Sequence, residues 1–170
     1  KHLKYINTRD SQLFNKSRLL YGWGAAQEFI RVQKRVLVVE GYTDVMACVR
    51  AGLKDAVAAL GTAFTDDHAK QIARLAKSAV VLLDGDAAGI RASYGAAEKL
   101  IRAKLKTNVA ALPPGEDPDS LLSKEGADAL QAVVDQARPA AEYFIEVAFS
   151  DSTMSIEDRV EAAAELAPVI

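Results

Sequence analysis

The chain has 170 residues, of which 50% are hydrophobic and 26% are charged, values typical of a soluble globular protein that buries a core. Its net charge of −2 is not the strongly positive charge that indicates binding to nucleic acid, although local charged patches carry more information than the total. The single cysteine, Cys48, excludes an intramolecular disulfide and a cysteine-rich zinc site, and no apolar run approaches the ~20 residues of a membrane span.

Taken in order, residues 1–33 mix basic with aromatic side chains, and from residue 34 to residue 112 strand-like runs alternate with helix-like segments. This alternation predicts an α/β fold with a parallel sheet and right-handed crossovers. A polar loop rich in turn residues follows at 113–119, and residues 120–170 are predicted to be helical only, with a break at Pro139. We expect strands at 36–39, 56–59, 79–83 and 108–111, helices at 44–51, 66–77 and 87–105, and N-caps at Thr43 and Thr65.

Two of the predicted strands end abruptly in acidic residues that are followed by glycine. Glu40 comes after the run 36–39, and Asp84 and Asp86 come after the run 79–83. The carboxyl ends of parallel strands meet at one edge of a sheet, where α/β proteins place their ligands. Carboxylates that converge there repel one another unless a cation lies between them, and oxygen ligands suit Mg²⁺ or Mn²⁺. The alternative is that Glu40 is an ordinary surface residue and that the two aspartates cap a helix.

A second pair of carboxylates flanks Pro118. Asp117 precedes proline and is therefore expected to be extended. If the strand at 108–111 ends at the same edge as the others, Asp117 and Asp119 could hold a second ion, and two ions roughly 3.5–4 Å apart suit phosphoryl transfer. The alternative is an ordinary turn before a helix that Asp119 caps.

The remaining candidates have local interpretations. Asp44 is predicted to be a first-turn acid that interacts favourably with the helix dipole, and not a metal ligand. Cys48 is predicted to be buried, and His68, which follows two acids in a first turn, is predicted to be exposed. The basic and aromatic residues between Lys4 and Trp23 are compatible either with nucleic-acid contacts or with solvated charges around a small core.

Taken together, these segments resemble the catalytic core of bacterial DnaG-type DNA primases. The resemblance to the TOPRIM module of that family rests on Glu40-Gly41-Tyr42-x-Asp44-Val45, Ala59-Leu60-Gly61-Thr62 and Asp84-Gly85-Asp86-x-Ala88-Gly89. Its specificity comes from flanking segments, namely Lys4-Tyr5-Ile6-Asn7, Phe14 to Gly22 including Lys16, and Leu112 to Leu121. The likeness extends over about residues 4 to 125.

The resemblance implies a TOPRIM-type parallel sheet flanked by helices and a DNA-dependent RNA polymerase that makes short RNA primers on single-stranded DNA from nucleoside triphosphates. It assigns metal binding to Asp84, Asp86, Asp117 and Asp119, and to Glu40 either metal binding or deprotonation of the attacking hydroxyl. Lys4, Asn7 and Lys16 would bind template or triphosphate. Mg²⁺ or Mn²⁺, in two or more ions, would be the cofactor, and a replicative helicase would be a partner in the cytoplasm.

The family pattern also predicts three parts: residues 1–33 as the end of an N-terminal subdomain, 34–137 as the TOPRIM domain, and 138–170 as part of a helical subdomain. The zinc-binding and helicase-binding domains of the family are absent from this sequence, so we expect a piece of a longer protein. The chain departs from the family where it has Asn7-Thr8-Arg9-Asp10-Ser11 and where Ser17 replaces a glycine. Two alternatives stay open: a TOPRIM nuclease or topoisomerase-type enzyme, and a non-catalytic nucleic-acid-binding module.

Overall fold

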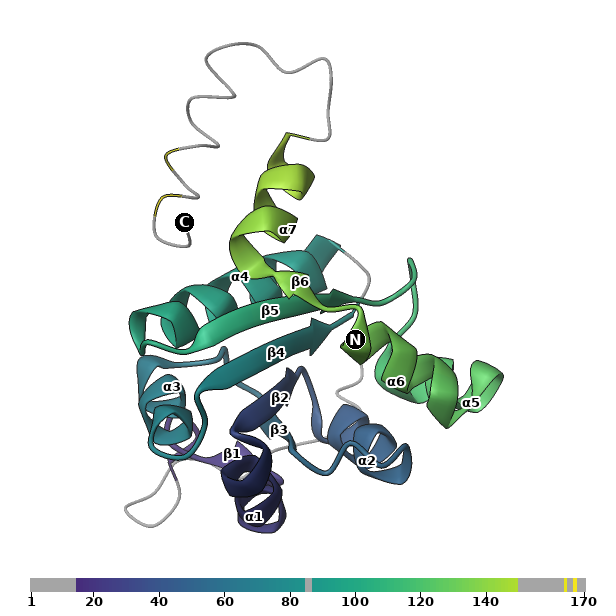
Figure 1. The fold of residues 1–170 in the computed structure, drawn as a ribbon, viewed down its shortest axis with the longest axis horizontal. Helices are drawn as coiled ribbons and strands as arrows, with labels where there is room; N and C mark the ends of the chain where they lie inside the picture. Colours follow the sequence, from purple (N-terminus) through teal and green to yellow (C-terminus); the bar gives the residue numbers. More distant parts are fainter. Residues whose placement is uncertain (1–14, 85–86, 150–163, 165–166, 168–170) are drawn as a thin grey trace.

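The fold was analysed in a computed structural model, which describes residues 15–84 and 87–149 together with residues 164 and 167. Within this part of the chain, one six-stranded sheet has the order β1-β3-β2-β4-β5-β6. Figure 1 shows this sheet with helices on both sides. The strands are β1 (Leu20–Tyr21), β2 (Arg35–Val39), β3 (Ala56–Ala59), β4 (Ser78–Leu83), β5 (Lys106–Ala111) and β6 (Arg138–Pro139).

The predicted parallel sheet is confirmed for its four central strands, and the four predicted strand positions are correct to within two residues. Both edges differ from the prediction, because β1 and β6 run antiparallel to their neighbours β3 and β5. The prediction that residues 120–170 form helices only is therefore wrong at Arg138–Pro139. Proline is tolerated there because β6 is an edge strand, where a missing backbone N–H disrupts no interior pairing.

Seven helices surround the sheet within the described residues. The first, α1, was not predicted, and α2 begins two residues earlier than expected, so Thr43 is not its N-cap as predicted; Gly41 takes that position. Thr65 is confirmed as the N-cap of α3, where its hydroxyl accepts a hydrogen bond from the backbone N–H of His68. The helices are α1 (Trp23–Gln33), α2 (Tyr42–Arg50), α3 (Asp66–Ala73), α4 (Ala87–Arg102), α5 (Pro118–Glu125), α6 (Ala127–Asp135) and α7 (Ala140–Ala148).

Alternate residues of the central strands point into two separate hydrophobic cores. On one face of β2, Val36 and Val38 pack in the core that includes residues of α1, α3, α4 and α7. On the other face, Leu37 and Val39 pack in the core that includes residues of α2, α5 and α6. Because both faces are covered, the strands have continuous apolar runs, as parallel strands in α/β proteins do.

One buried ion pair ties the start of β2 to the start of β3. The carboxylate of Asp55 is fully buried and accepts hydrogen bonds from Arg35 Nε at 2.8 Å and Nη2 at 3.3 Å. This two-point contact holds the guanidinium in a fixed orientation. The described part of the chain contains no helix with the length and apolar character needed to cross a lipid bilayer.

Candidate active site

The site is built at the edge of the sheet where β2, β4 and β5 end. Val38 pairs with Val81, so continuing the register places Glu40 beside Leu83, one residue before Asp84. Leu83 pairs with Ala111, after which the chain enters the loop that leads to Asp117. The topology therefore brings the two predicted acidic segments and the predicted loop to the same edge.

Asp84 is held by very close packing between its own backbone and α4. A Cβ atom placed on Gly89 would lie 2.1 Å from the carbonyl oxygen of Asp84, a distance that no side chain tolerates. Glycine at position 89 therefore allows the first turn of α4 to approach the end of β4. The side-chain atom Oδ1 of Asp84 is buried in this environment.

Asp44 is a member of this acidic cluster that the sequence analysis did not place there. As predicted, it lies in the first turn of a helix, and its Oδ2 accepts a hydrogen bond from the backbone N–H of Gly41 at 2.8 Å. It is also 7% exposed, and burial raises its pKa to about 6, with further contributions from the negative charges of Asp84 and Asp117. Carboxylates from α2, from the end of β4 and from the start of α5 are thus close enough to repel one another.

Asp117 and Asp119 have different surroundings in the structure. Asp117 is extended, as predicted, and it is the N-cap of α5, because its Oδ1 accepts a hydrogen bond from the backbone N–H of Ser120 at 2.6 Å. The alternative interpretation had given that capping position to Asp119. Asp119 is exposed and its carboxylate lies 3.7 Å from Arg50 Nη1.

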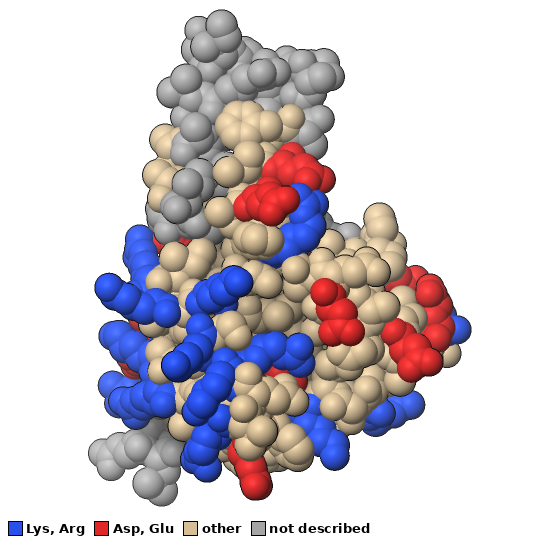
Figure 2. All heavy atoms as spheres, viewed as in Figure 1, with Lys and Arg blue, Asp and Glu red and all other residues tan. Residues whose placement is uncertain are grey.

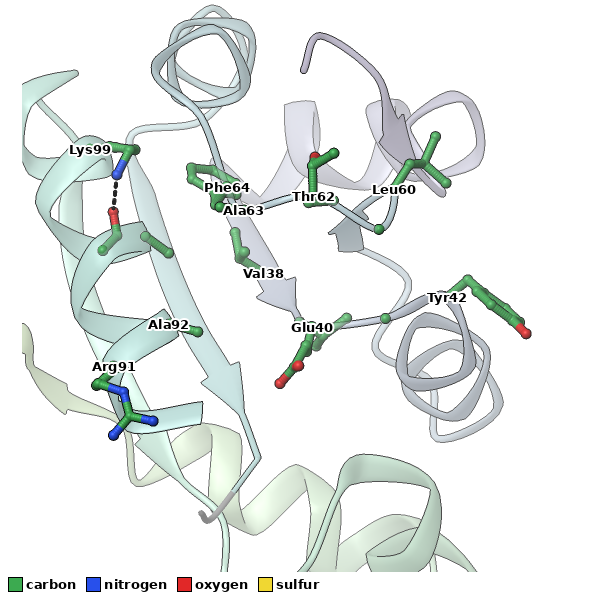
Figure 3. A pocket seen from close by; sticks show the side chains of 16 residues that line it. Val38, Glu40, Tyr42, Leu60, Thr62, Ala63, Phe64, Arg91, Ala92 and Lys99 are labelled. Carbon is green, nitrogen blue, oxygen red and sulfur yellow. Dashed lines mark hydrogen bonds between the residues drawn. The ribbon is translucent and has the colours of Figure 1, made fainter. Parts of the chain in front are cut away.

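A cavity of about 690 Å³ opens beside Glu40. Figure 3 shows Glu40 and Arg91 toward one end of this cavity and Phe64 and Lys99 toward the other. The two basic residues come from α4, and Lys99 Nζ donates a hydrogen bond to the carbonyl oxygen of Gly95 at 3.0 Å. Neither Arg91 nor Lys99 was predicted from the sequence to belong to the site. The signal that could have found them is their position on the helix that directly follows the Asp84–Asp86 segment.

Not every predicted site residue falls in the described part of the chain. Lys4, Asn7 and Asp86 lie outside the described residues. Lys16 is half-buried, and its backbone is held against α3. Within the described ranges, no group of three histidine, cysteine, aspartate or glutamate residues is placed so that it could hold a metal ion.

The donors that are present nevertheless fit a hard divalent cation. They are carboxylate oxygens, the ligand type that Mg²⁺ and Mn²⁺ prefer. The pKa of Asp44 is raised mainly by burial, and the negative charges of Asp84 and Asp117 raise it further. A divalent cation beside Asp84 would reverse that local sign.

The other end of the sheet, where β2, β4 and β5 begin, is basic. Exposed lysines stand at the turns that lead into β2, β4 and β5, and the backbone N–H of Lys77 donates to Lys34 O while that of Lys106 donates to Lys77 O. Figure 2 shows Lys and Arg side chains gathered over the end of the molecule where α3 lies and where β4 and β5 begin. The small net charge of the chain therefore results from acidic residues at the carboxyl ends of the central strands and basic residues at their amino ends.

Comparison with known proteins gives a consistent family. The model of the Toprim-like family matches residues 37–122. DNA primase of Pseudomonas aeruginosa is 37% identical over 172 residues, a match that covers 98% of this chain and 26% of that protein. The chain thus spans about a quarter of the length of this curated relative.

Solved structures of primase domains have the same fold. The RNA polymerase domain of Mycobacterium tuberculosis primase DnaG matches with a TM-score of 0.87 and 33% identity, over 99% of this chain and 57% of that one. A DnaG primase catalytic domain bound to single-stranded DNA matches with a TM-score of 0.81 and 34% identity, over 96% of this chain and 54% of that one. The chain has an α/β fold of the TOPRIM type, and it belongs to the Toprim-like family as a fragment of the bacterial DnaG primase type.

Proposed function

We propose that this chain carries the catalytic centre of a DNA primase, a DNA-dependent RNA polymerase that makes short RNA primers on single-stranded DNA. The observation that supports the proposal is the strand register, which brings Glu40, Asp84 and the loop before Asp117 to the same end of the sheet. The relative that was solved with single-stranded DNA supports the assignment of the template. Nucleoside triphosphates would be the substrates and an RNA primer the product.

In this proposal the acidic residues hold Mg²⁺ or Mn²⁺ at the end of the sheet. Asp84, Asp86 and Asp117 are the central ligands, and Asp119 would have to leave Arg50 to join them. Bound divalent ions would neutralise charge on the triphosphate and on the leaving pyrophosphate. Without them the site would repel an anionic substrate.

The protein's own side chains would position the reactants. Glu40 is exposed and borders the cavity, so it can either ligate an ion or accept the proton of the primer 3′-hydroxyl as that oxygen attacks the α-phosphate. Arg91 and Lys99 border the same cavity and offer positive charge to the phosphate tail. Lys4, Asn7 and Lys16 would bind the template or the triphosphate. A replicative helicase, met in the cytoplasm through a domain outside this chain, would deliver the template.

The proposal is tested by primer synthesis with the full-length protein on single-stranded DNA in the presence of Mg²⁺. We expect Asp84→Asn to lower the rate by about 100-fold or more, because the change removes a metal-binding charge without a change in size. Asp128→Asn is the matched control, since Asp128 is an exposed first-turn acid of α6. Near-normal synthesis by a folded Asp84→Asn protein would contradict the proposal. Cleavage of labelled DNA without nucleotides, with no primer formed when they are added, would instead favour a nuclease.

A further inference from the structure

His68 is fully buried in the first turn of α3, contrary to the prediction that it is exposed. Its Nδ1 accepts a hydrogen bond from the backbone N–H of Thr65 at 3.2 Å, and its Nε2 lies 3.2 Å from the carbonyl oxygen of Lys16. A carbonyl oxygen only accepts, so Nε2 must carry the hydrogen, and the neutral ring satisfies both partners. Burial lowers the pKa of His68, which keeps the ring in this neutral form at pH 7.

The contact between His68 and Lys16 is one of three that α3 and its N-cap make with consecutive residues. Thr65 Oγ1 donates a hydrogen bond to the carbonyl oxygen of Ser17 at 2.7 Å. The Gln71 side-chain amide, with its nitrogen toward the segment, donates to the carbonyl oxygen of Arg18 at 3.0 Å and accepts from Trp23 Nε1 at 2.9 Å. Three successive backbone carbonyls, at residues 16, 17 and 18, thus accept hydrogen bonds from side chains of α3 and its N-cap.

The segment just before this helix borders the cavity next to Glu40. Phe64 lines that cavity, and its ring centroid lies 5.4 Å from that of His68. His68 therefore stands between the cavity wall seen in Figure 3 and the backbone of Lys16. An outer ion pair, between Arg18 Nε and Asp67 Oδ2 at 3.2 Å, lies beside these contacts but is largely exposed, so it contributes little.

We propose that His68 is a positioning residue, which fixes the backbone of Lys16 against α3 and so sets where the Lys16 ammonium group meets the phosphates of substrate or template. The inference rests on the proposed function of Lys16. A four-carbon side chain such as lysine has many rotamers, so its effect on an anion depends on how firmly its backbone is anchored. The contacts from Thr65 and Gln71 hold the backbone of residues 17 and 18 against α3. The contact from His68 holds Lys16, the residue to which the function is assigned.

Two substitutions separate the two hydrogen bonds of the ring. Asparagine in place of His68 keeps an acceptor for the N–H of Thr65 but is too short to reach Lys16 O, whereas glutamine places an amide nitrogen near the former position of Nε2. We expect His68→Asn to raise the KM for nucleoside triphosphate about threefold to tenfold with kcat changed less than twofold, as for the loss of one hydrogen bond. We expect His68→Gln to stay within about twofold of the parent KM. A purely structural role would move both variants together.

A double-mutant cycle with Lys16→Ala distinguishes this inference from the proposed function. If Lys16→Ala leaves both KM and template affinity unchanged, the assigned role of Lys16 is wrong, and the inference falls with it. Suppose that Lys16→Ala raises KM and that His68→Asn raises KM in the Lys16→Ala protein by the same factor as in the parent. Lys16 then has its assigned role, but His68 does not act through it. The inference requires that His68→Asn has no further effect once Lys16 is alanine.

Trypsin gives a readout that does not depend on activity, because it cleaves after Lys16 and Arg18. Because the His68 contact is lost, the His68→Asn protein should be cleaved at these two bonds severalfold faster than the parent. The cleavage is measured by mass spectrometry, and cleavage after the exposed Lys124 is the internal reference. Cleavage in His68→Gln should match the parent. Equal rates after Lys16 in all three proteins would overturn the inference, whatever their thermal stabilities.

Discussion

Replacing Asp44 by asparagine should stabilise the metal-free protein at neutral pH. The asparagine side chain has almost the same shape as that of aspartate, and its oxygen could still accept the hydrogen bond from the N–H of Gly41. What disappears is a buried negative charge beside Asp84 and Asp117. Because the charge is unfavourable in the folded state, its removal should raise the free energy of unfolding.

The size of the effect follows from the pKa of Asp44, which rises from 3.8 to about 6 on folding. A raised carboxyl pKa means that the folded state binds the proton more tightly than the unfolded state. The parent protein is then most stable below pH ~4 with respect to this group, and stability is lost as the pH rises from about 4 to about 6. At about 1.4 kcal/mol for each pH unit, the loss amounts to at most about 3 kcal/mol at pH 8.

Urea unfolding of both proteins from pH 4 to pH 8, in buffer with a chelator, measures this difference directly. The difference in unfolding free energy between the two proteins cancels the titration of groups that do not interact with Asp44, so it reports Asp44 together with its coupling to Asp84 and Asp117. We expect it to be near zero at pH 4 and to favour Asp44→Asn by up to about 3 kcal/mol at pH 8. Millimolar Mg²⁺ at pH 8 should stabilise the parent more than Asp44→Asn. A pH-independent difference, or a less stable Asp44→Asn protein at pH 8, would refute the reasoning.

The other predictions concern packing and ion pairing. Gly89→Ala should destabilise the fold by more than about 2 kcal/mol in urea unfolding, because the new Cβ atom would meet the backbone of Asp84. Gly24→Ala is the control: this glycine lies in a helix with no atom near the new methyl group, so the change should be neutral or stabilising by up to about 1 kcal/mol. Equal stabilities of the two variants would show that α4 does not press on Asp84. Asp55→Asn should cost about 3 kcal/mol of thermal or urea stability at pH 7, since it leaves the partly buried Arg35 without its charged partner. A loss below about 0.5 kcal/mol would show that this ion pair does not hold β2 to β3.

The central strands could be predicted because burial on both faces leaves a clear pattern in the sequence. Strands β2 and β4 are largely apolar runs, each followed by an acid and a glycine, and the alternation of strands with helices indicates that they run parallel. The edge strands β1 and β6 have two residues each, too few for any periodicity. Their antiparallel pairing is decided by tertiary contacts with β3 and β5.

The site was predictable as a location and less so as a set of residues. The edge of the sheet follows from topology, which brings Glu40, Asp84 and the loop before Asp117 together. Asp44 was not expected in the site because a first-turn acid that interacts favourably with the helix dipole already accounted for it. His68 was predicted to be exposed because its neighbours in sequence are acidic, but its ring contacts Phe64 and the backbone of Lys16, which the local sequence does not indicate.

The most direct test of the account is a crystal of the protein soaked with Mn²⁺ and a nucleoside triphosphate, measured for anomalous scattering. The account predicts an anomalous peak about 2.0–2.3 Å from a carboxylate oxygen of Asp84 and from one of Glu40 or Asp117. Phosphate oxygens of the nucleotide should complete the coordination of the same ion. Manganese bound only at single surface carboxylates, with none at the end of β4, would contradict it.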